Sequence, residues 1–376
     1  MPTINGYRQS VLTQASVRSM QDEMARLQRQ LDTDRKYDNF GEYGGRASRE
    51  IISLRGDINR TDAYDATIHT LDGRAGAANE AMQAIAKISQ DVRNDAYQLR
   101  VHDPVQPAGL RDVAGAAFED VVRQLNTQVN GHHVFAGSKA TTPPVKPAAD
   151  ILTSVKTAID DAINAALTAV PPTTLTFDDL MAAADSVFDD TTSPWADPGV
   201  EQAAVRISDL KEVTSKTRID PHNPNDPFRS LAQKLAVLAV VDPRDENLQR
   251  VLAYSSPMTS PDPAVPVSED HVVAARQLYI TFAEQTGDAL TRAVDGTTTL
   301  RGLKNVIAEN GQYRAALDAQ IEAHATLRLH AGTALGKVEG IDAYEAVTRI
   351  QNLQTNLETS YRVTSELRRL TLANFL

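Results

Sequence analysis

The chain has 376 residues, with 38 Lys and Arg against 49 Asp and Glu, which gives a net charge of −11 at pH 7. A protein that binds nucleic acid must present a basic face to the phosphates, so this balance excludes a general nucleic-acid binder. The chain has no cysteine, which excludes disulfides, thiol catalysis and thiolate metal sites. Aromatic residues make up only 5%, so cores must be built from Ala, Val, Leu and Ile, a composition that suits close helix–helix contact.

Apolar segments are short throughout the chain. The longest run, residues 235–241, is far below the ~18 residues that a transmembrane helix needs. Residues 1–10 lack a basic region followed by an apolar run, so no Sec-type signal is predicted. We therefore expect no membrane partner, and a soluble protein that stays in the cytoplasm or is exported without a cleaved signal peptide.

An apolar seam marks the first predicted helix, residues 8–36. Steps of three and four place the seam on one narrow stripe, of the kind that a coiled-coil partner buries. Its residues are Val17, Met20, Met24, Leu27 and Leu31. Glycines 41, 44 and 45 then break the helix and are interpreted as a flexible joint. Ser48 is the predicted N-cap of the next helix.

A second helix is predicted over residues 51–99, because an apolar pattern runs there without a proline. Such a helix would be about 75 Å long at about 1.5 Å per residue, a length typical of coiled coils and bundles. Pro104 and Pro107 end it. A third helix follows over residues 108–130, with Gly131 at the position of a C-terminal cap.

The middle of the chain has a different composition. Of the 18 prolines, 15 lie between Pro143 and Pro266, so long helices cannot continue through this part. We interpret it as an inserted mixed α/β domain. Its predicted elements are helices over 151–169 and 177–188, a hairpin of strands 205–210 and 213–219, and a helix that begins after Asp226 and Pro227 and ends at Val241.

The long-helix pattern returns from about residue 268 to about residue 331, with breaks near Gly296 and Gly302. A turn over residues 336–342 leads into the last helix, which Asp342 caps and which ends near residue 372. This helix carries a second seam. Its residues are Ile350, Leu353, Leu357, Tyr361, Leu367 and Leu370.

The predicted fold class is mainly α, with long antiparallel helices or a coiled coil formed from both chain ends around the inserted domain. The predicted domains are a terminal helical domain (1–47 plus 338–376), a helical rod (48–138 plus 267–337) and a variable outer domain (139–266). Neither terminal helix can bury its seam alone. The seams either pair within one chain or pack against other chains, and both arrangements indicate an assembling protein.

Catalytic and cofactor-binding motifs do not stand out in the sequence. The histidine groupings are His132 with His133 and His324 with His330. Adjacent residues point to opposite sides of a strand, and a spacing of six residues does not place two zinc ligands on one helix face. We expect a solvated turn at the first pair, no metal site, no cofactor and no enzymatic activity.

Three stretches of the chain resemble the flagellin superfamily. Residues 125–137, which end in Asn-Gly-His-His-Val-Phe-Ala-Gly, are similar to its Asn-Gly…Leu-Phe-Ala-Gly segment. Residues 338–346 resemble its turn into the last helix. Residues 353–364, which contain Leu-Glu-Thr-Ser-Tyr, and residues 370–376 resemble its C-terminal pattern. Within the superfamily, the stretches most resemble the hook-associated protein 3 family of hook–filament junction proteins.

The resemblance implies a structural axial protein of the bacterial flagellum whose terminal helices form an inner tube. It implies four partners: neighbouring copies of the chain, the adjoining hook-associated protein, flagellin, and an export chaperone on the C-terminal helix. It also implies export by the flagellar type III route to an extracellular position. Filament flagellin is the alternative, and a type III secretion tip or translocator protein is a further one.

Overall fold

The computed structural model describes residues 3–98, 107–169, 173–192, 194–253 and 269–373. The fold is mainly α-helical, as predicted, with two small two-stranded sheets in the described part of the chain. Contacts divide the chain into two compact units: unit 1 comprises residues 1–63 and 322–376, and unit 2 comprises residues 64–321. The predicted division into three domains stays a prediction.

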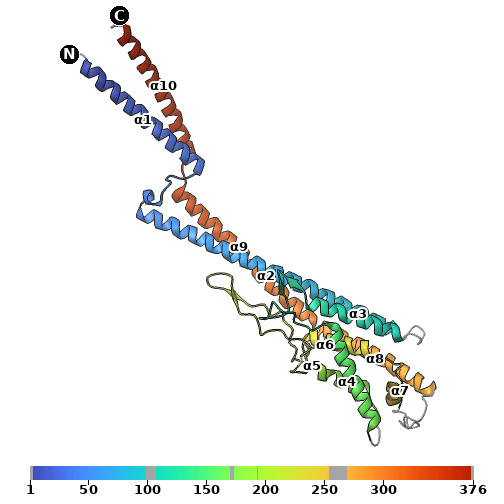
Figure 1. Cartoon of the computed structure of the whole chain (residues 1–376). Helices are drawn as coiled ribbons and strands as arrows, with labels where there is room; N and C mark the ends of the chain where they lie inside the picture. The colour runs from blue at the N-terminus through green and yellow to red at the C-terminus, as the bar shows by residue number, and fades with distance from the viewer. Residues whose placement is uncertain (1–2, 99–106, 170–172, 193, 254–268, 374–376) are drawn as a thin grey trace. The chain divides into compact units, whose positions relative to one another are not determined.

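Unit 1 is built from the two ends of the chain. It contains α1 (Thr3–Thr33), the short 3-10 helix η1 (Phe40–Tyr43), the start of α2 (Gly44–Gln98), the end of α9 (Leu303–Glu339) and α10 (Ala343–Ala373). Figure 1 shows α1, in blue, beside α10, in dark red, and the two helices are in contact. They run antiparallel, because Gln21 contacts Tyr361 while Lys36, farther along the chain, contacts Glu339.

Unit 2 contains the rest of α2 and α9 and all the elements between them. These are α3 (Pro107–Leu125), β1 (Gln128–Val129), β2 (His132–His133), α4 (Ala148–Thr168), α5 (Phe177–Phe188), β3 (Val205–Arg206), β4 (Glu212–Val213), α6 (Pro227–Val240), α7 (Glu246–Ala253) and α8 (Glu269–Asp295). Both sheets are antiparallel hairpins, β1 with β2 and β3 with β4.

Helix α6 lies at the centre of the unit 2 core. It contacts α3, α4, α5 and α8, and nearly every residue from Phe228 to Leu238 is buried. A helix that is apolar on all sides must be enclosed by other elements. The apolar run that the sequence shows at residues 235–241 is therefore a core helix.

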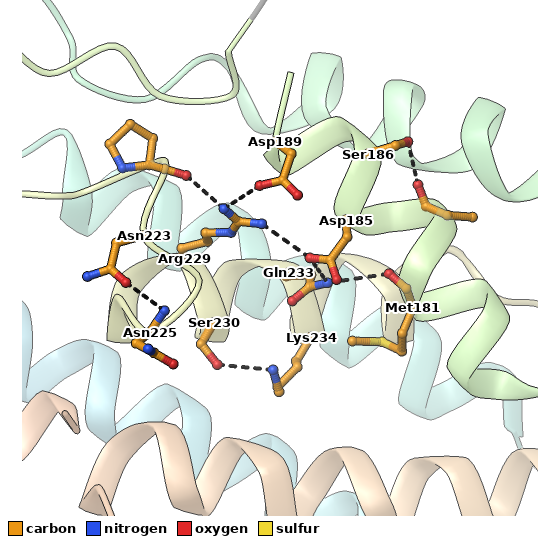
Figure 2. Close-up of polar contacts among 12 residues, drawn as sticks. Met181, Asp185, Ser186, Asp189, Asn223, Asn225, Arg229, Ser230, Gln233 and Lys234 are labelled. Carbon is orange, nitrogen blue, oxygen red and sulfur yellow. Dashed lines mark hydrogen bonds and ion pairs between the residues drawn. The ribbon is translucent and has the colours of Figure 1, made fainter. Parts of the chain in front are cut away.

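Three polar side chains of α6 are buried in this core, and Figure 2 shows their partners. Arg229 donates to the carbonyl of Pro221 at 3.1 Å and forms ion pairs with Asp185 at 3.3 Å and Asp189 at 2.6 Å. Gln233 donates to the same Asp185 carboxylate at 2.6 Å. Ser230 accepts a hydrogen bond at 3.0 Å from Lys234, whose pKa burial lowers. The contacts with Asp185 and Asp189 join α6 to α5.

The sequence predicted the caps of two helices correctly. The carboxylate of Asp226 accepts hydrogen bonds from the backbone N–H groups of Phe228 and Arg229 at 2.9 and 3.1 Å, with Pro227 in the first turn. Asp342 accepts from Tyr344 and Glu345 at 3.0 Å each, at the start of α10. The predicted break near Gly296 and Gly302 is also confirmed, since α8 ends at Asp295 and α9 begins at Leu303.

Burial of Asp226 predicts a pH dependence for the stability of unit 2. Desolvation raises its pKa to about 6, against the lowering effect of three backbone N–H groups. The folded state therefore holds a proton at pH values where the unfolded chain, with a pKa of ~3.9, has lost it. Stability then falls as the pH rises from about 4 to about 6, by about 3 kcal/mol in total.

Asp226→Asn keeps a capping side chain but cannot ionise, so this fall should be missing from the variant. Urea unfolding at pH 4.5 and pH 7 measures the difference between variant and wild type. Asp342→Asn, at an exposed cap, is the matched control and should leave the difference unchanged. Equal pH dependence in wild type and Asp226→Asn would show that the buried carboxyl contributes nothing.

Several predicted helix ends were wrong, including those of α1, which spans Thr3–Thr33 and not 8–36, and of α9, which ends at Glu339 and not near 331. Helix α3 ends at Leu125 rather than 130, and Gly131 is not a helix cap. Asn130 and Gly131 both have positive φ and form the turn between β1 and β2, as in type I′ hairpins. Ser48 is not an N-cap either, because α2 already begins at Gly44, and the Ser48 hydroxyl donates back to the Gly44 carbonyl at 2.8 Å.

The predicted strands 205–210 and 213–219 were too long. Only Val205–Arg206 pairs with Glu212–Val213. Beyond β4 the chain leaves its partner because the unit 2 interior offers other contacts. Thr217 donates to the Asn310 side chain at 3.3 Å, and the Ile219 N–H donates to the Phe135 carbonyl at 3.4 Å. The alternating pattern therefore marks an extended segment that lies on the core outside a sheet.

Candidate assembly surface

The seam of α1 faces α10, but it is only partly covered. Leu27 is buried, with 5% of its surface exposed. The other predicted seam residues of α1 are half-buried: Val17, Met20, Met24 and Leu31. The predicted seam therefore lies on the face of α1 that is turned toward α10, and only Leu27 is tightly packed.

The seam of α10 behaves in the same way. Leu357 is buried, with 6% exposed, while Ile350 and Leu353 are half-buried. Tyr361 is 51% exposed, and its hydroxyl accepts a hydrogen bond from Gln21 of α1 at 2.8 Å. Leu367 and Leu370 fall within α10, but their side chains lie outside the described residues.

The structure thus brings the two seams together within one chain. Of the two arrangements that the sequence left open, it contains the intramolecular pair. Ala346 of α10 is also buried, and the sequence did not indicate it because alanine carries little signal. Each buried leucine contributes about 1.5–3 kcal/mol to the pairing. Because few side chains are enclosed in this way, the total free energy that holds α1 to α10 is small.

Other apolar side chains of α1 and α10 are exposed to solvent. A helix that pairs with one neighbour buries one stripe, so apolar residues on its other faces remain in water. We call these the outer apolar residues: Val11 and Leu12 of α1, and Tyr344, Val347 and Val363 of α10. All five are exposed, and the seam prediction missed them because they lie off its spacing. Each is an apolar side chain of the paired helices that this chain leaves in water.

The short link between α9 and α10 requires a glycine at position 340. Helix α9 continues to Glu339, so the predicted turn over 336–342 is confined to residues 340–342 and Gly336 is helical. The Gly340 N–H donates to the Gly336 carbonyl at 2.8 Å. A Cβ atom at Gly340 would lie 2.3 Å from that oxygen, which no real contact allows.

Gly340→Ala should therefore destabilise unit 1 by about 1–3 kcal/mol, because the link must shift to relieve the clash. Gly332→Ala is the matched control, since a Cβ there meets nothing within 4 Å inside α9. The control should stabilise the helix by about 0.5–1 kcal/mol. Thermal unfolding followed by circular dichroism checks both signs. A stabilising Gly340→Ala would contradict the described link.

The segment that follows α3 is explained by its contacts in unit 2. Phe135 is fully buried and packs edge-on against Phe228 at 5.3 Å between ring centroids. The Ala136 carbonyl accepts from the Gly199 N–H at 2.8 Å. Gly137 has φ +56, and a Cβ there would lie 2.5 Å from the Val200 carbonyl oxygen. The Phe-Ala-Gly residues therefore hold α3 to the middle of the chain.

The histidines of the two predicted groupings have different surroundings. His133 was expected in a solvated turn but is buried: Nδ1 lies 2.9 Å from the Asn126 carbonyl oxygen and Nε2 lies 2.8 Å from Gln128 Nε2. His324 is buried in α9, whereas His330 is exposed. The described part of the chain contains no group of three His, Cys, Asp or Glu side chains that could hold a metal ion. None of its helices is long and apolar enough to cross a membrane.

The two units differ sharply in charge. Unit 1 contains 16 Lys and Arg against 15 Asp and Glu, a net charge of +1, whereas unit 2 contains 22 against 34, a net charge of −12. The net negative charge of the chain is therefore carried by unit 2. A near-neutral unit can approach copies of itself without strong repulsion, which an acidic unit cannot.

Comparisons with known proteins give a limited result. No protein-family model matches the chain. No curated protein matches it in sequence. A solved structure from Vibrio parahaemolyticus, provisionally described as a flagellar hook-associated protein, is similar with a TM-score of 0.44 and 12% identity. The similarity covers 77% of this chain and 96% of that chain.

Proposed function

We propose that the chain is a structural, non-enzymatic axial protein of the bacterial flagellum that forms the hook–filament junction. The observation that supports this proposal most is the pairing of helices from opposite ends of the chain, α1 and α10, with outer apolar residues left in water. The stretches of residues 125–137, 338–346 and 353–376 that resemble flagellin-superfamily segments indicate the class.

The proposed mechanism couples folding to assembly. In the free subunit, the α1–α10 pair has few enclosed side chains and little to hold it together. In a tube, the outer apolar residues of one pair pack against neighbouring copies, and each apolar side chain removed from water contributes about 1.5–3 kcal/mol. Assembly therefore stabilises the folded α1–α10 pair, which is only weakly stable in the single chain. Copies at the two faces of the junction would contact the adjoining hook-associated protein and flagellin.

The charge distribution fits this arrangement. Unit 1, with its net charge of +1, is suited to close contact between copies, while unit 2, with −12, is suited to solvent. Before assembly, the outer apolar residues of α10 need cover, and we propose that an export chaperone supplies it on the C-terminal helix. Export would follow the flagellar type III route, leaving the protein outside the cell in the flagellum.

Two other functions remain as alternatives. Filament flagellin would use the same terminal helices and differs from a junction protein in its position and copy number. A type III secretion tip or translocator protein would also have helical ends, but it would act on membranes. The resemblance of residues 353–376 favours the flagellar readings.

Site-specific labelling distinguishes the junction from the filament. The chain has no cysteine, so a single cysteine at the exposed Ser154 of α4 would carry a maleimide dye uniquely. A labelled junction protein should appear as one short band between hook and filament by immunoelectron microscopy or fluorescence. Label along the whole filament would identify a flagellin, and absence from flagella would contradict the axial role. Wild-type cells treated with the same dye are the control.

A further inference from the structure

The two linkers of unit 1 meet at a single residue. Residues 34–43 join α1 to α2, and residues 340–342 join α9 to α10. The Lys36 N–H, in the first linker, donates to the carbonyl of Glu339 at 2.8 Å, at the end of α9 and next to the second linker. This hydrogen bond ties the first linker to the end of α9, directly before the second linker.

The Glu339 side chain adds two charged contacts at this point. It is buried, and its Oε2 lies 2.7 Å from Nη2 of Arg55 on α2. The Arg55 guanidinium also lies over the ring of Phe40 in η1, 5.2 Å from the centroid. Arg35, in the linker two residues after the end of α1, places its Nε 3.7 Å from the same Oε2, which is too far for a hydrogen bond.

The second carboxylate oxygen of Glu339, Oε1, accepts no hydrogen bond from the described residues. It is also buried. A buried charged oxygen without a donor is unfavourable, so the site gains stability when a donor reaches it. Arg35 is the cation at hand: it already lies within ion-pair range of the carboxylate, and its side chain is half-exposed and able to move.

We propose that Glu339 is a positioning residue that gives the joint two arrangements. In the one described here, Arg55 alone is hydrogen-bonded to the carboxylate. In the other, Arg35 donates to Oε1, and the carboxylate then bridges the first linker, α2 and α9. Because Lys36 follows Arg35 directly, this second bond draws the end of α1 toward α9 and redirects the α1–α10 pair. The two arrangements involve only residues of unit 1, so the proposal does not depend on which protein the α1–α10 pair binds or on the proposed function.

Spin labels on the full chain test the proposal, because cysteines at the exposed Ser19 of α1 and Thr333 of α9 would be the only ones present. Pulsed electron paramagnetic resonance measures the distance distribution between the labels. The labelled background should show two distance populations. Arg35→Gln should remove one population, and Glu339→Gln should merge both into one broad distribution while circular dichroism shows the helices retained.

Glu345→Gln is the matched control, since this exposed glutamate forms only a 3.8 Å surface pair with Arg349 in α10. Its distribution should match the background. Loss of one of two background populations in Arg35→Gln, absent from the control, supports the proposal, and a single population in the labelled background overturns it. An unchanged distribution in Arg35→Gln overturns it, even where Glu339→Gln unfolds unit 1, and so does an equal change in the control.

Discussion

Leu357→Asp is expected to separate α10 from α1 and to abolish assembly. Leu357 is one of the few fully covered side chains of the pair, so the substitution removes an apolar contact and places a charge in the same position. The combined cost is at least about 3 kcal/mol, more than a weakly packed pair can lose. The double replacement of Leu353 and Leu357 with Asp should act in the same direction.

Hydrogen exchange on the monomer measures the pairing, and sedimentation or electron microscopy measures assembly. The variant should exchange rapidly over residues 8–36 and 342–376, while unit 2 keeps its protection. Val363→Asp is the comparison: this side chain is 48% exposed, so the pair should survive and only association between copies should weaken. Normal assembly by Leu357→Asp would contradict the role of the seam, and normal assembly by Val363→Asp would contradict that of the outer apolar residues.

Arg229→Ala should cost about 3–5 kcal/mol of unit 2 stability. The Arg229 side chain is only 3% exposed, and its loss leaves a hole beside α5, an unpaired Pro221 carbonyl, and two aspartates without their cation. The side chains of Asp185 and Asp189 are about half-exposed or more, so water partly replaces the lost interaction with the Arg229 guanidinium. The packing loss is therefore a large share of the effect.

Two further substitutions separate packing from charge. Arg229→Met restores volume without charge and should recover a substantial part of the loss. Arg123→Ala removes an exposed arginine that pairs with Asp120 at 2.8 Å, and should cost less than about 1 kcal/mol. Urea unfolding of all three variants gives the free energies. If Arg229→Ala and Arg123→Ala were equally mild, the buried network would not stabilise the unit.

Periodicity and capping chemistry predicted much of the helical frame. The seams of α1 and α10 identify their inward faces because a 3-4 spacing places residues on one stripe whatever the partner is. Asp226 and Asp342 were correct as caps because a side-chain oxygen one residue before a helix can reach its free N–H groups. Gly131 and Ser48 were misassigned because glycine and serine serve turns and helix interiors as well as helix ends.

Contacts between distant residues could not be predicted in this way. Glu339, Arg35 and Arg55 meet only because α1, α2 and α9 converge, and their spacing in the chain carries no sign of it. Arg229 is similar, since a charged residue is expected at the surface and is buried here only because Asp185 and Asp189 lie opposite. The outer apolar residues were missed because periodicity selects one stripe and ignores single apolar residues elsewhere.

Deleting the gene tests the central claim most directly, with electron microscopy of the cells and an assay for flagellin in the medium. A hook–filament junction protein predicts bare hooks and flagellin lost to the medium, because exported flagellin has nothing to assemble on. Restoring the gene should restore filaments, whereas restoring it with Leu357→Asp should not. Bare hooks without secreted flagellin would identify the chain as the filament protein, and normal flagella would contradict an axial role.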